Sequence, residues 1–540
     1  MNCKTGSPVV KYYYYGGVFG MQKTGALGAP ETGDVMSLEL KKLQNGSDIR
    51  GVAMEGIEGE SINLGSGEAA ALTRGFVLWL EEKTGKSASE MKVSVGHDSR
   101  ISADSLKETL IYTLMESGIH VFDCGLASTP AMFMSTIFDE YKCDGAIMIT
   151  ASHLPFNRNG FKYFSPDGGL DKKDISKIIE YGEAGKAPEA HGLGSVEETD
   201  LIGAYSEYLR NKIIKEVAHP EYPDKPLTGL KIVVDAGNGA GGFYAERILE
   251  PLGADITGSQ FLEPDGNFPN HQPNPENKEA MASISKAVLE NHADLGLIFD
   301  TDVDRSAAVD KSGREIARNG IVALAAALIA VEHPGTTVVT DSITSDELTD
   351  YLVDCLGLKH LRFKRGYRNV INKAVELNSL GIDAQLAIET SGHAAYKENY
   401  FLDDGAYLAT KIVIKEAQLH QKGVDISVMI ESLKEPKEAI EVRFPIEDRD
   451  FAVYGDQVLE GLKVWVKAKE DKGLSLVVPN YEGVRINFDL PQVRGWCLLR
   501  KSLHDPIMPL NCEVTEGSCE TILEIMAAFL DGYSRIKVRK

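Results

Sequence analysis

The sequence predicts an α/β protein with three related α/β domains, each a mixed sheet flanked by helices, followed by a smaller C-terminal α+β domain. The length of 540 residues exceeds what one hydrophobic core can organise. A short β-branched run that ends on Asp and small or polar residues occurs three times, and a second strand-like run follows each one. Beyond about residue 435 this pattern gives way to alternating strand-like stretches and one last helix.

The three repeats place their strand-like runs at similar separations. The first runs begin at Met91, Leu230 and Thr336, and the second runs begin at Asp144, Asp294 and Ala384. Helical stretches lie between them, such as 102–118, for which we expect Ser102 to be the N-cap. Ligands bind at the carboxyl ends of strands in open α/β sheets, so each repeat offers one polar loop for binding.

Domain boundaries are expected where the repeats begin and end. We expect an irregular N-terminal extension over 1–40 and three α/β domains over 41–198, 199–312 and 313–434. The α+β domain is then expected over 435–540.

Charge and hydropathy exclude several classes of protein. A net charge of −23 argues against a general nucleic-acid binder, which needs a basic face. The longest apolar run, Ile321 to Val331, is shorter than the roughly 20 residues that span a bilayer, so we expect a buried helix and no membrane partner. Seven scattered cysteines without a CxxC pair indicate reduced thiols. Without an apolar signal core, the protein is expected in the cytoplasm, or in an organelle or plastid stroma if its acid-poor start is a transit remnant.

The stretch "DTDVDR" is a candidate metal site. Asp300, Asp302 and Asp304 directly follow an apolar run, and alternate side chains of an extended segment point the same way. Oxygen ligands alone favour Mg²⁺, Mn²⁺ or Ca²⁺ over zinc. A helix-loop-helix calcium site is rejected because Arg305 and Lys311 stand where it needs Gly and Glu. The alternative is a solvated acidic turn.

Three more polar loops carry candidate residues, and each has a plain structural alternative. Ser152 in "TASHLP" is a nucleophile or a helix cap, and the G-x-S-x-G elbow of a hydrolase is absent. The stretch "ETSGH", from Glu389 to His393, suits sugar hydroxyls or forms an N-cap and turn. Arg500 in "RKSLHDP" is placed to bind a phosphate, or belongs to an ordinary surface loop.

Together and in this order, these loops resemble those of the α-D-phosphohexomutase family, which includes phosphoglucomutase, phosphomannomutase and phosphoglucosamine mutase. "SDIRG" resembles its arginine loop, and "TASHLPFNRNGFK" its phosphoserine loop, T-A-S-H-N-P with N-G-x-K. "DTDVDR" matches its metal loop D-x-D-x-D-R, and "ETSGH" with "LDDG" resembles its sugar loop E-x-S-G-H. "LLRKSLHDP" stands where the family has R-x-S-N-T-E-P for phosphate. The resemblance runs from about Asp48 to the C-terminus.

The resemblance implies four domains around one central cleft, which carry the phosphoserine, metal, sugar-binding and phosphate-binding loops in turn. It implies an isomerase, an intramolecular phosphotransferase that interconverts hexose 1-phosphate and hexose 6-phosphate, with glucose or mannose as the hexose. The reaction would pass through a phosphoserine and a 1,6-bisphosphosugar, which also serves as activator. The implied metal is Mg²⁺, held by Ser152, Asp300, Asp302 and Asp304. The implied catalytic residues are Ser152, His153, Arg50, Lys162, Arg305 and His393; His393 is favoured as the general acid/base, ahead of His153. The implied substrate-binding residues are Lys364, Gly366, Glu389, Ser391, Arg500, Ser502 and His504.

Three departures from the family pattern leave alternatives open. Leu154 replaces an Asn beside the serine, and Leu503, His504 and Asp505 replace Asn-Thr-Glu in the phosphate loop. Tyr367 stands where a His is common. The alternatives are a phosphoglucosamine mutase, a catalytically weak relative that binds sugar phosphates, and a phosphatase without a mutase step. We expect a monomer or a small homo-oligomer that acts on a phosphorylated hexose.

Overall fold

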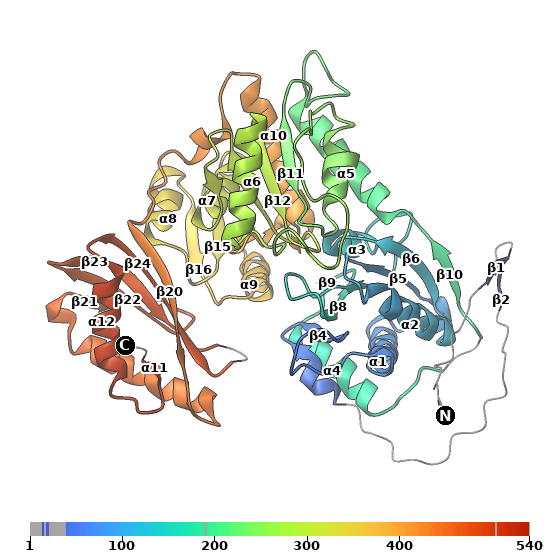
Figure 1. Ribbon diagram of the computed structural model, residues 1–540, viewed down its shortest axis with the longest axis horizontal. Coiled ribbons are helices and arrows are strands. Elements are labelled where there is room, and N and C mark those ends of the chain that lie inside the picture. Colours follow the sequence, from blue (N-terminus) through green and yellow to red (C-terminus); the bar gives the residue numbers. More distant parts are fainter. Residues whose placement is uncertain (1–12, 16–17, 21–38, 190–191, 503–504, 539–540) are drawn as a thin grey trace, which may run out of the picture. The chain divides into compact units, whose positions relative to one another are not determined.

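The structure is a computed structural model that describes residues 13–15, 18–20, 39–189, 192–502 and 505–538. The chain divides into two compact units, residues 1–39 and 40–540. In the first unit, β1 (Tyr13–Tyr15) and β2 (Val18–Gly20) pair antiparallel. All further elements belong to the second unit. Its four sheets come one after another in the sequence, as the colours in Figure 1 show.

The first sheet is mixed, with the strand order β10-β6-β5-β7-β8-β4-β3 and β9 paired to β8. Its strands from β10 to β7 run parallel, and β8, β4 and β3 alternate in direction. The strands are β3 (Gln44–Asn45), β4 (Asp48–Val52), β5 (Lys92–His97), β6 (His120–Leu126), β7 (Gly145–Ile149), β8 (Arg158–Ser165), β9 (Gly168–Gly169) and β10 (Ser195–Glu198). The helices are α1 (Ser66–Thr84), α2 (Ala103–Glu116), α3 (Thr129–Met134) and α4 (Lys172–Glu183), with 3₁₀ turns at Leu40–Leu43 and Ala88–Glu90.

The second sheet has the order β11-β12-β13-β14, in which only the first pair is parallel. Its strands are β11 (Ile232–Asp235), β12 (Leu295–Phe299), β13 (Ser306–Asp310) and β14 (Glu315–Ile316). The helices before and between them are α5 (Leu201–Val217) and α6 (Lys278–Asn291), with a π-helical segment at Tyr244–Leu249.

The third sheet has the order β16-β15-β17-β18-β19, with β15 parallel to both of its neighbours. Its strands are β15 (Thr337–Thr340), β16 (Lys359–Arg362), β17 (Ala384–Ile388), β18 (Ala394–Tyr396) and β19 (Leu402–Asp403). Its helices are α7 (Asn319–Ala330), α8 (Asp346–Asp350), α9 (Tyr367–Ser379) and α10 (Gly405–His420), with a π-helical segment at Tyr351–Cys355 and 3₁₀ turns at Lys397–Asn399 and Ile426–Ile430.

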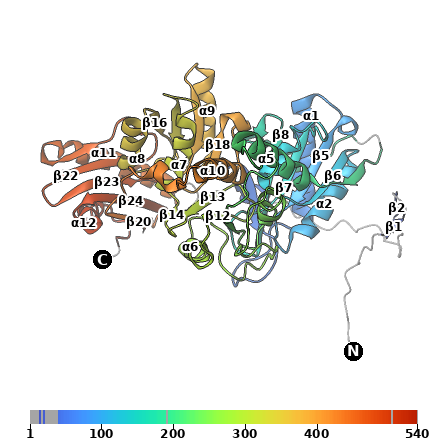
Figure 2. The ribbon, with the colours of Figure 1, turned by 90° about the horizontal axis from the view of Figure 1, so that it is seen from above.

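The fourth sheet is antiparallel throughout, in the order β20-β24-β23-β22-β21. Its strands are β20 (Glu438–Pro445), β21 (Leu474–Leu476), β22 (Val484–Leu490), β23 (Val493–Leu499) and β24 (Ile507–Glu516). Two helices, α11 (Phe451–Lys467) and α12 (Cys519–Leu530), accompany it, with a 3₁₀ turn at Glu470–Lys472 (Figure 2).

One plan repeats in the first three sheets. A parallel pair (β5 with β7, β11 with β12, β15 with β17) is followed by an antiparallel strand (β8, β13, β18). The middle strands β7 and β12 are buried at every residue, as the interior strands of sheets covered on both faces are. The predicted fold class, three related α/β domains and a C-terminal α+β domain, is confirmed.

Several separate apolar cores lie among the described residues. One runs through buried side chains of the first three sheets, from Phe122 to Leu433. Two smaller cores lie between the second sheet and α6 and between the third sheet and α9. Another holds only side chains of the fourth sheet and its flanking segments, from Phe444 to Ile536.

Two expectations are modified by the structure. Ser102 does occupy the N-cap position of α2, but its hydroxyl caps no backbone amide there and instead accepts a hydrogen bond from Asn159. The expected buried helix, Ile321 to Val331, is α7, but Val331 lies just after it and is 79% exposed. No helix among the described residues is both long and apolar enough to cross a membrane.

Candidate active site

All four candidate loops join two antiparallel neighbours of a sheet. The serine loop (150–157) follows β7, the metal loop (300–305) follows β12, and the sugar loop (389–393) follows β17. The fourth loop (500–506) joins β23 to β24. The first three loops therefore occupy the same position in three copies of one plan, each after the second strand of the parallel pair.

Ser152 of the serine loop lies against the metal loop, 148 residues away in sequence. Its side chain is almost fully buried, and its hydroxyl donates to Asp300 Oδ2 at 3.1 Å. The Arg305 guanidinium donates to the same hydroxyl at 3.1 Å. The backbone of Ser152 has a φ of 51°, a left-handed conformation that side chains other than glycine rarely adopt. A strand, not a helix, follows the loop, so the helix-cap alternative for Ser152 is excluded.

One arginine that the sequence analysis did not single out holds this loop. Arg100 is fully buried at its side chain, and its guanidinium donates to the backbone carbonyls of Ser152, Leu154, Pro155 and Arg158. The loop is thus fixed through its backbone, and the residue type at position 154 is not what fixes it. The "HDSR" stretch after β5, at the end of a strand, was the signal that could have indicated it.

The metal loop brings three carboxylates together in the interior. Asp300, Asp302 and Asp304 have no exposed surface, and one carboxylate oxygen of each lies within 4.8 Å of the others. Thr129 at the start of α3 holds Asp302 by a hydrogen bond of 2.5 Å. The loop is therefore fixed from the first domain as well as from its own sheet.

The three carboxylates fit a hard divalent cation. Oδ1 of Asp302 and Oδ1 of Asp304 are buried and accept no hydrogen bond. Burial and the neighbouring Asp304 raise the pKa of Asp300 well above its ordinary value. Free carboxylate oxygens and a raised carboxyl pKa are both expected where like charges share a site without a neutralising cation. Oxygen donors are also the ligands that Mg²⁺ takes.

Three cationic side chains surround the same loop. Lys162 Nζ donates to Asp304 Oδ2 at 2.6 Å, and Arg305 Nε donates to Asp300 Oδ2 at 3.0 Å. Burial opposes the charge of Lys162, but Asp304 raises its pKa well above the ordinary value, so it stays an ammonium. Arg50 belongs to β4 and pairs with Asp48 at 3.0 Å. Positive charge thus faces both the serine and the acidic loop.

The two histidines differ in their surroundings. His153 Nδ1 lies 2.8 Å from Arg305 Nη2, and burial together with Arg305 lowers the pKa of His153 to about 2. His393 accepts or donates a hydrogen bond of 2.9 Å with Ser391 at Nδ1, and its Nε2 lies 3.5 Å from Asp304 Oδ1. Burial lowers the pKa of His393 as well, while Asp304 opposes this shift.

Backbone contacts join the sugar loop to the metal loop. Ser306 N donates to the carbonyl of Gly392 at 3.4 Å, and Arg305 forms an isolated bridge with His393. Gly392 has a φ of +93°, and a Cβ there would lie 2.5 Å from the Ser306 carbonyl oxygen. Only glycine allows this approach.

Glu389 faces the segment that precedes α9. Its Oε1 accepts a hydrogen bond of 2.7 Å from Gly366 N. Burial, followed by the charge of Asp341, raises the pKa of Glu389 to about 8. Lys364 of the same segment is exposed. The structure therefore brings Glu389 and Gly366 together and leaves Lys364 on the surface.

The fourth loop is described in part. Leu503 and His504 lie outside the described residues, whereas Ser502 Oγ accepts a hydrogen bond of 3.2 Å from Asp505 N. The nearest acidic partner of Arg500 is Glu441, at 4.0 Å. Burial lowers the pKa of Arg500, and the charge of Arg365 in the third domain lowers it further. Arg500 thus lies near the third domain, and no described hydrogen bond or ion pair joins it to the serine loop.

Three further residues lie in the site that were not among the candidate residues from the sequence. Asn274 and Glu276, from the stretch before α6, contact Arg305 at 3.1 and 3.8 Å. Both oxygens of Asp403 are buried and accept no described hydrogen bond, and Oδ2 lies 3.6 Å from His393 Nε2. The only signal for Asp403 was its place in "LDDG".

The site combines a serine with three buried aspartates that fit a metal ion, and basic side chains lie around both. A polar loop of the kind that suits sugar hydroxyls lies next to them. In a multidomain α/β protein, this combination is typical of the class that binds phosphorylated ligands. Family models for phosphoglucomutase/phosphomannomutase α/β/α domains I, II and III match residues 41–187, 204–313 and 318–435. The chain belongs to the phosphoglucomutase/phosphomannomutase family, the α-D-phosphohexomutases.

Relatives of the chain match it over most of their own length. A phosphomannomutase/phosphoglucomutase of Pseudomonas syringae is 30% identical over 89% of this chain and 94% of the relative. A phosphoglucomutase/phosphomannomutase of Thermococcus kodakarensis is 32% identical over 81% of this chain and 90% of the relative. The crystal structure of a family protein from Burkholderia thailandensis has a TM-score of 0.73 at 26% identity, covering 91% of this chain and 97% of that one.

Proposed function

We propose that the protein is a phosphohexomutase that moves a phosphoryl group between positions 1 and 6 of a hexose phosphate, with Ser152 as the carrier. The relatives named above support hexose phosphate as the substrate class. The single observation that carries the proposal is the position of the Ser152 hydroxyl, 3.1 Å from both Asp300 Oδ2 and Arg305 Nη2. A carboxylate site for a cation and a guanidinium are what phosphoryl transfer needs around its nucleophile.

In the proposed reaction, phosphorylated Ser152 meets hexose 1-phosphate. The 6-hydroxyl attacks the phosphorus, the bond from phosphorus to Ser152 Oγ breaks, and a 1,6-bisphosphosugar forms. The intermediate then turns over, and Ser152 takes the phosphoryl group from position 1, leaving hexose 6-phosphate. Arg305, Lys162 and Arg50 would stabilise the charge that moves between oxygens.

The proton on the attacking hydroxyl needs an acceptor. His393 is the better candidate of the two histidines, because its Nε2 faces Asp304 of the metal loop at 3.5 Å. His153 faces the Arg305 guanidinium instead, and its pKa of about 2 makes it a poor acceptor of the proton. Glu389 and Ser391 would bind sugar hydroxyls, and Arg500 with Ser502 and His504 would bind the phosphate that is not being transferred.

Mg²⁺ is proposed as the cofactor, held by Asp300, Asp302, Asp304 and the oxygen on Ser152. When bound, it would neutralise charge on the transferred phosphoryl group. The buried, unpaired oxygens of Asp302 and Asp304 support this assignment. We further propose that the protein is a monomer or a small homo-oligomer. The cytoplasm or an organelle stroma is the proposed compartment, since the described cysteines are free and most are buried.

The test is a coupled assay with Mg²⁺, a trace of hexose 1,6-bisphosphate, and glucose, mannose or glucosamine 1-phosphate. We expect 6-phosphate to form from at least one of the three, and the preferred sugar separates the hexose from the glucosamine alternative. Ser152→Ala should lower kcat at least about a thousandfold, because the phosphoryl carrier is gone.

Two other outcomes decide against the proposal. Release of inorganic phosphate without 6-phosphate identifies a phosphatase. Binding of sugar phosphate without turnover identifies a catalytically weak relative. Chelation should abolish 6-phosphate formation, and added Mg²⁺ should restore it; wild-type activity that persists in excess EDTA removes the metal assignment.

A further inference from the structure

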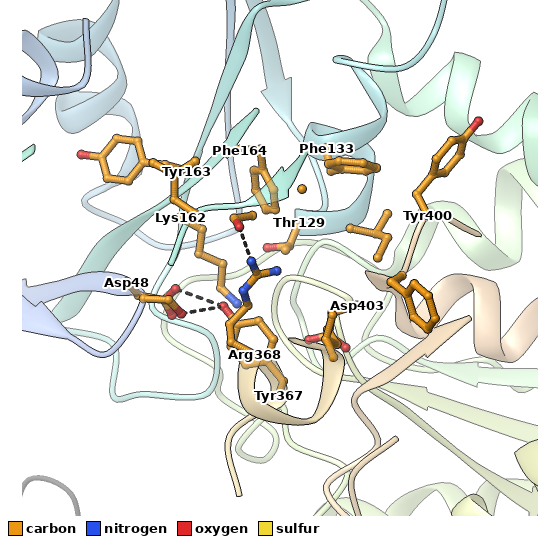
Figure 3. Close-up of a pocket in the computed structure, with 17 residues that line it drawn as sticks. Asp48, Thr129, Phe133, Lys162, Tyr163, Phe164, Tyr367, Arg368, Tyr400 and Asp403 are labelled. Atoms are coloured by element: carbon orange, nitrogen blue, oxygen red, sulfur yellow. Dashed lines mark hydrogen bonds between the residues drawn. The ribbon is translucent and has the colours of Figure 1, made fainter. Parts of the chain in front are cut away.

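Tyr367, the first residue of α9, reaches from the third domain to the first. Its hydroxyl lies 3.2 Å from Asp48 Oδ1 and 3.3 Å from Ser47 Oγ, both in the arginine loop at β4. Figure 3 shows Tyr367 beside Asp48 and Lys162, with which it lines a pocket. Asp48 in turn pairs with Arg50 at 3.0 Å. The phenol therefore contacts the anion that holds one candidate catalytic arginine.

The ring of Tyr367 carries two further contacts. It stacks on the imidazole of His393, with centroids 5.2 Å apart and an angle of 18° between the planes. Lys162 Nζ lies 5.1 Å from its centroid, a cation–π distance. Both partners also face Asp304, at 3.5 Å from His393 Nε2 and 2.6 Å from Lys162 Nζ. One side chain thus touches two candidate catalytic residues directly and a third through Asp48.

We propose that Tyr367 is a positioning residue that fixes His393, Lys162 and the Asp48–Arg50 pair in register across two domains; this rests on the proposed function. Tyr367 remains a neutral donor, because burial and Asp48 raise its pKa above the ordinary value.

Two variants separate the parts of this role. Tyr367→Phe keeps the stack and the cation–π contact but loses the hydroxyl, and we expect kcat to fall about three- to tenfold. Tyr367→Leu loses all of these contacts, and we expect kcat to fall about a hundredfold or more with KM changed by less than about threefold, since each of these contacts is to another side chain of the protein. Partial rescue by Phe is the signature of positioning by the ring.

Tyr163 is the matched control. It is a buried tyrosine of the first domain, its hydroxyl has no described hydrogen-bond partner, and its ring packs on Phe76 with centroids 4.8 Å apart. Tyr163→Phe and Tyr163→Leu should leave kcat within about twofold of wild type, although the Leu variant lowers the unfolding temperature by creating a cavity. A fall in kcat for Tyr163→Leu equal to that for Tyr367→Leu would mean that loss of stability, and not positioning, lowers the rate.

The stack has a readout that needs no activity. In protein labelled with ¹³C at histidine Cε1, the His393 signal, assigned by His393→Gln, should carry a ring-current shift that remains in Tyr367→Phe and disappears in Tyr367→Leu. If the His393 signal of Tyr367→Leu stays at its wild-type position, the inference is overturned. A kcat of Tyr367→Leu equal to that of the wild type also overturns it. A larger rise in KM than fall in kcat also overturns it, because that indicates a contact to substrate.

The failure of this inference is distinguishable from the failure of the proposed function. Wild type and Ser152→Ala are measured in the same assay, so a wild type without mutase activity refutes the function alone, and the histidine signal still decides the stack. If Tyr367→Leu does not fold, Tyr367→Phe and Tyr367→His carry the test, with the His variant expected to lose the phenol contact and to show lowered kcat.

Discussion

At the scale of single residues, burial decides which groups carry protons. Glu389 illustrates this, because its carboxyl group is enclosed beside Asp341 and has a pKa of about 8. At neutral pH it is a neutral acid that both donates and accepts hydrogen bonds. Such a group can bind a sugar hydroxyl without adding a negative charge next to a phosphorylated substrate.

A pH prediction follows for Glu389. The group is protonated below pH 8 and ionises above it, so hydroxyl donation is lost and repulsion of the phosphate appears as pH rises. We expect the KM for hexose 1-phosphate to rise about three- to tenfold between pH 7 and 9. Steady-state kinetics across this range measure it.

Glu389→Gln provides the control for that prediction. The amide keeps a donor and an acceptor but does not titrate, so its KM should stay level between pH 7 and 9. The assignment to Glu389 is wrong if the Gln variant keeps the rise of the wild type, or if the wild type itself shows none.

The residues proposed from the sequence were those in which polar groups follow an apolar run. Asp300 and Glu389 stand directly after strands and Ser152 stands three residues after one, and the structure brings Ser152 and Asp300 together. Tyr367 and Asp48 are 319 residues apart in sequence, and Thr129 and Asp302 are 173 apart. No local pattern reports such a pair, because the contact exists only once two domains have packed.

At the scale of elements, the serine loop shows how a strained backbone is held. Ser152 has a positive φ, and Arg100 compensates for this by binding four carbonyl groups of the same loop. Strain of this kind persists only where the surroundings over-determine it. The orientation of Ser152, the proposed phosphoryl carrier, therefore depends on a residue in a different loop.

Arg100→Lys tests this dependence. An ammonium cannot reach four carbonyls, so we expect the free energy of unfolding to fall by about 2 kcal/mol, and transfer of phosphate from labelled bisphosphate to Ser152 to slow at least about tenfold. Chemical denaturation and quenched-flow labelling measure the two quantities.

Leu154→Asn is the companion variant, since it restores the residue common in the family. Because the backbone of the loop is already fixed, phosphorylation of Ser152 should change by less than about threefold. A large gain would show that the amide side chain, and not Arg100, orders the loop.

The elements themselves were predictable because their signals are local. β5, β7, β11, β12, β15 and β17 begin within about two residues of their expected starts, since apolar runs report strands directly. Ser102 shows the limit: its N-cap position was foreseen, but Asn159 takes its hydroxyl from outside the helix. The domain boundaries stay predictions.

At the scale of the whole molecule, one arginine ties the third domain to the fourth. Arg485 of β22 donates to the carbonyls of Ser342 and Thr344 at 3.0 Å each and to Asp346 Oδ1 at 3.0 Å. Its guanidinium lies 3.5 Å from the centroid of Trp496. Burial and the nearby Arg362 lower the pKa of Arg485 to about 9, which reflects the cost of enclosing this charge.

Arg485→Met should loosen this tie without damaging either core. Methionine fills the space over Trp496 but binds no carbonyl, so calorimetry should resolve the fourth domain as a separate unfolding transition. Arg494→Met, at an exposed ion pair with Asp489, should leave the wild-type profile unchanged. A single transition in Arg485→Met, unchanged from wild type, contradicts the role given to Arg485.

Sequence alone reached the family because four loops in fixed order are more specific than any one of them. The sequence did not predict the hydrogen bonds by which Arg485 joins the third and fourth domains, since "GVR" at the start of a strand indicates only a strand. It also left His504 as a substrate contact, and that residue lies outside the described part of the chain.

The separation of the fourth sheet's core from the core shared by the first three sheets has a consequence for synthesis and for evolution. A chain that leaves the ribosome from its N-terminus cannot close the shared interior until about residue 433 has emerged, so the first three domains mature together. The fourth sheet and its helices have an interior of their own. Exchange of this part between relatives by recombination would therefore leave untouched the interior that holds the serine and aspartate loops.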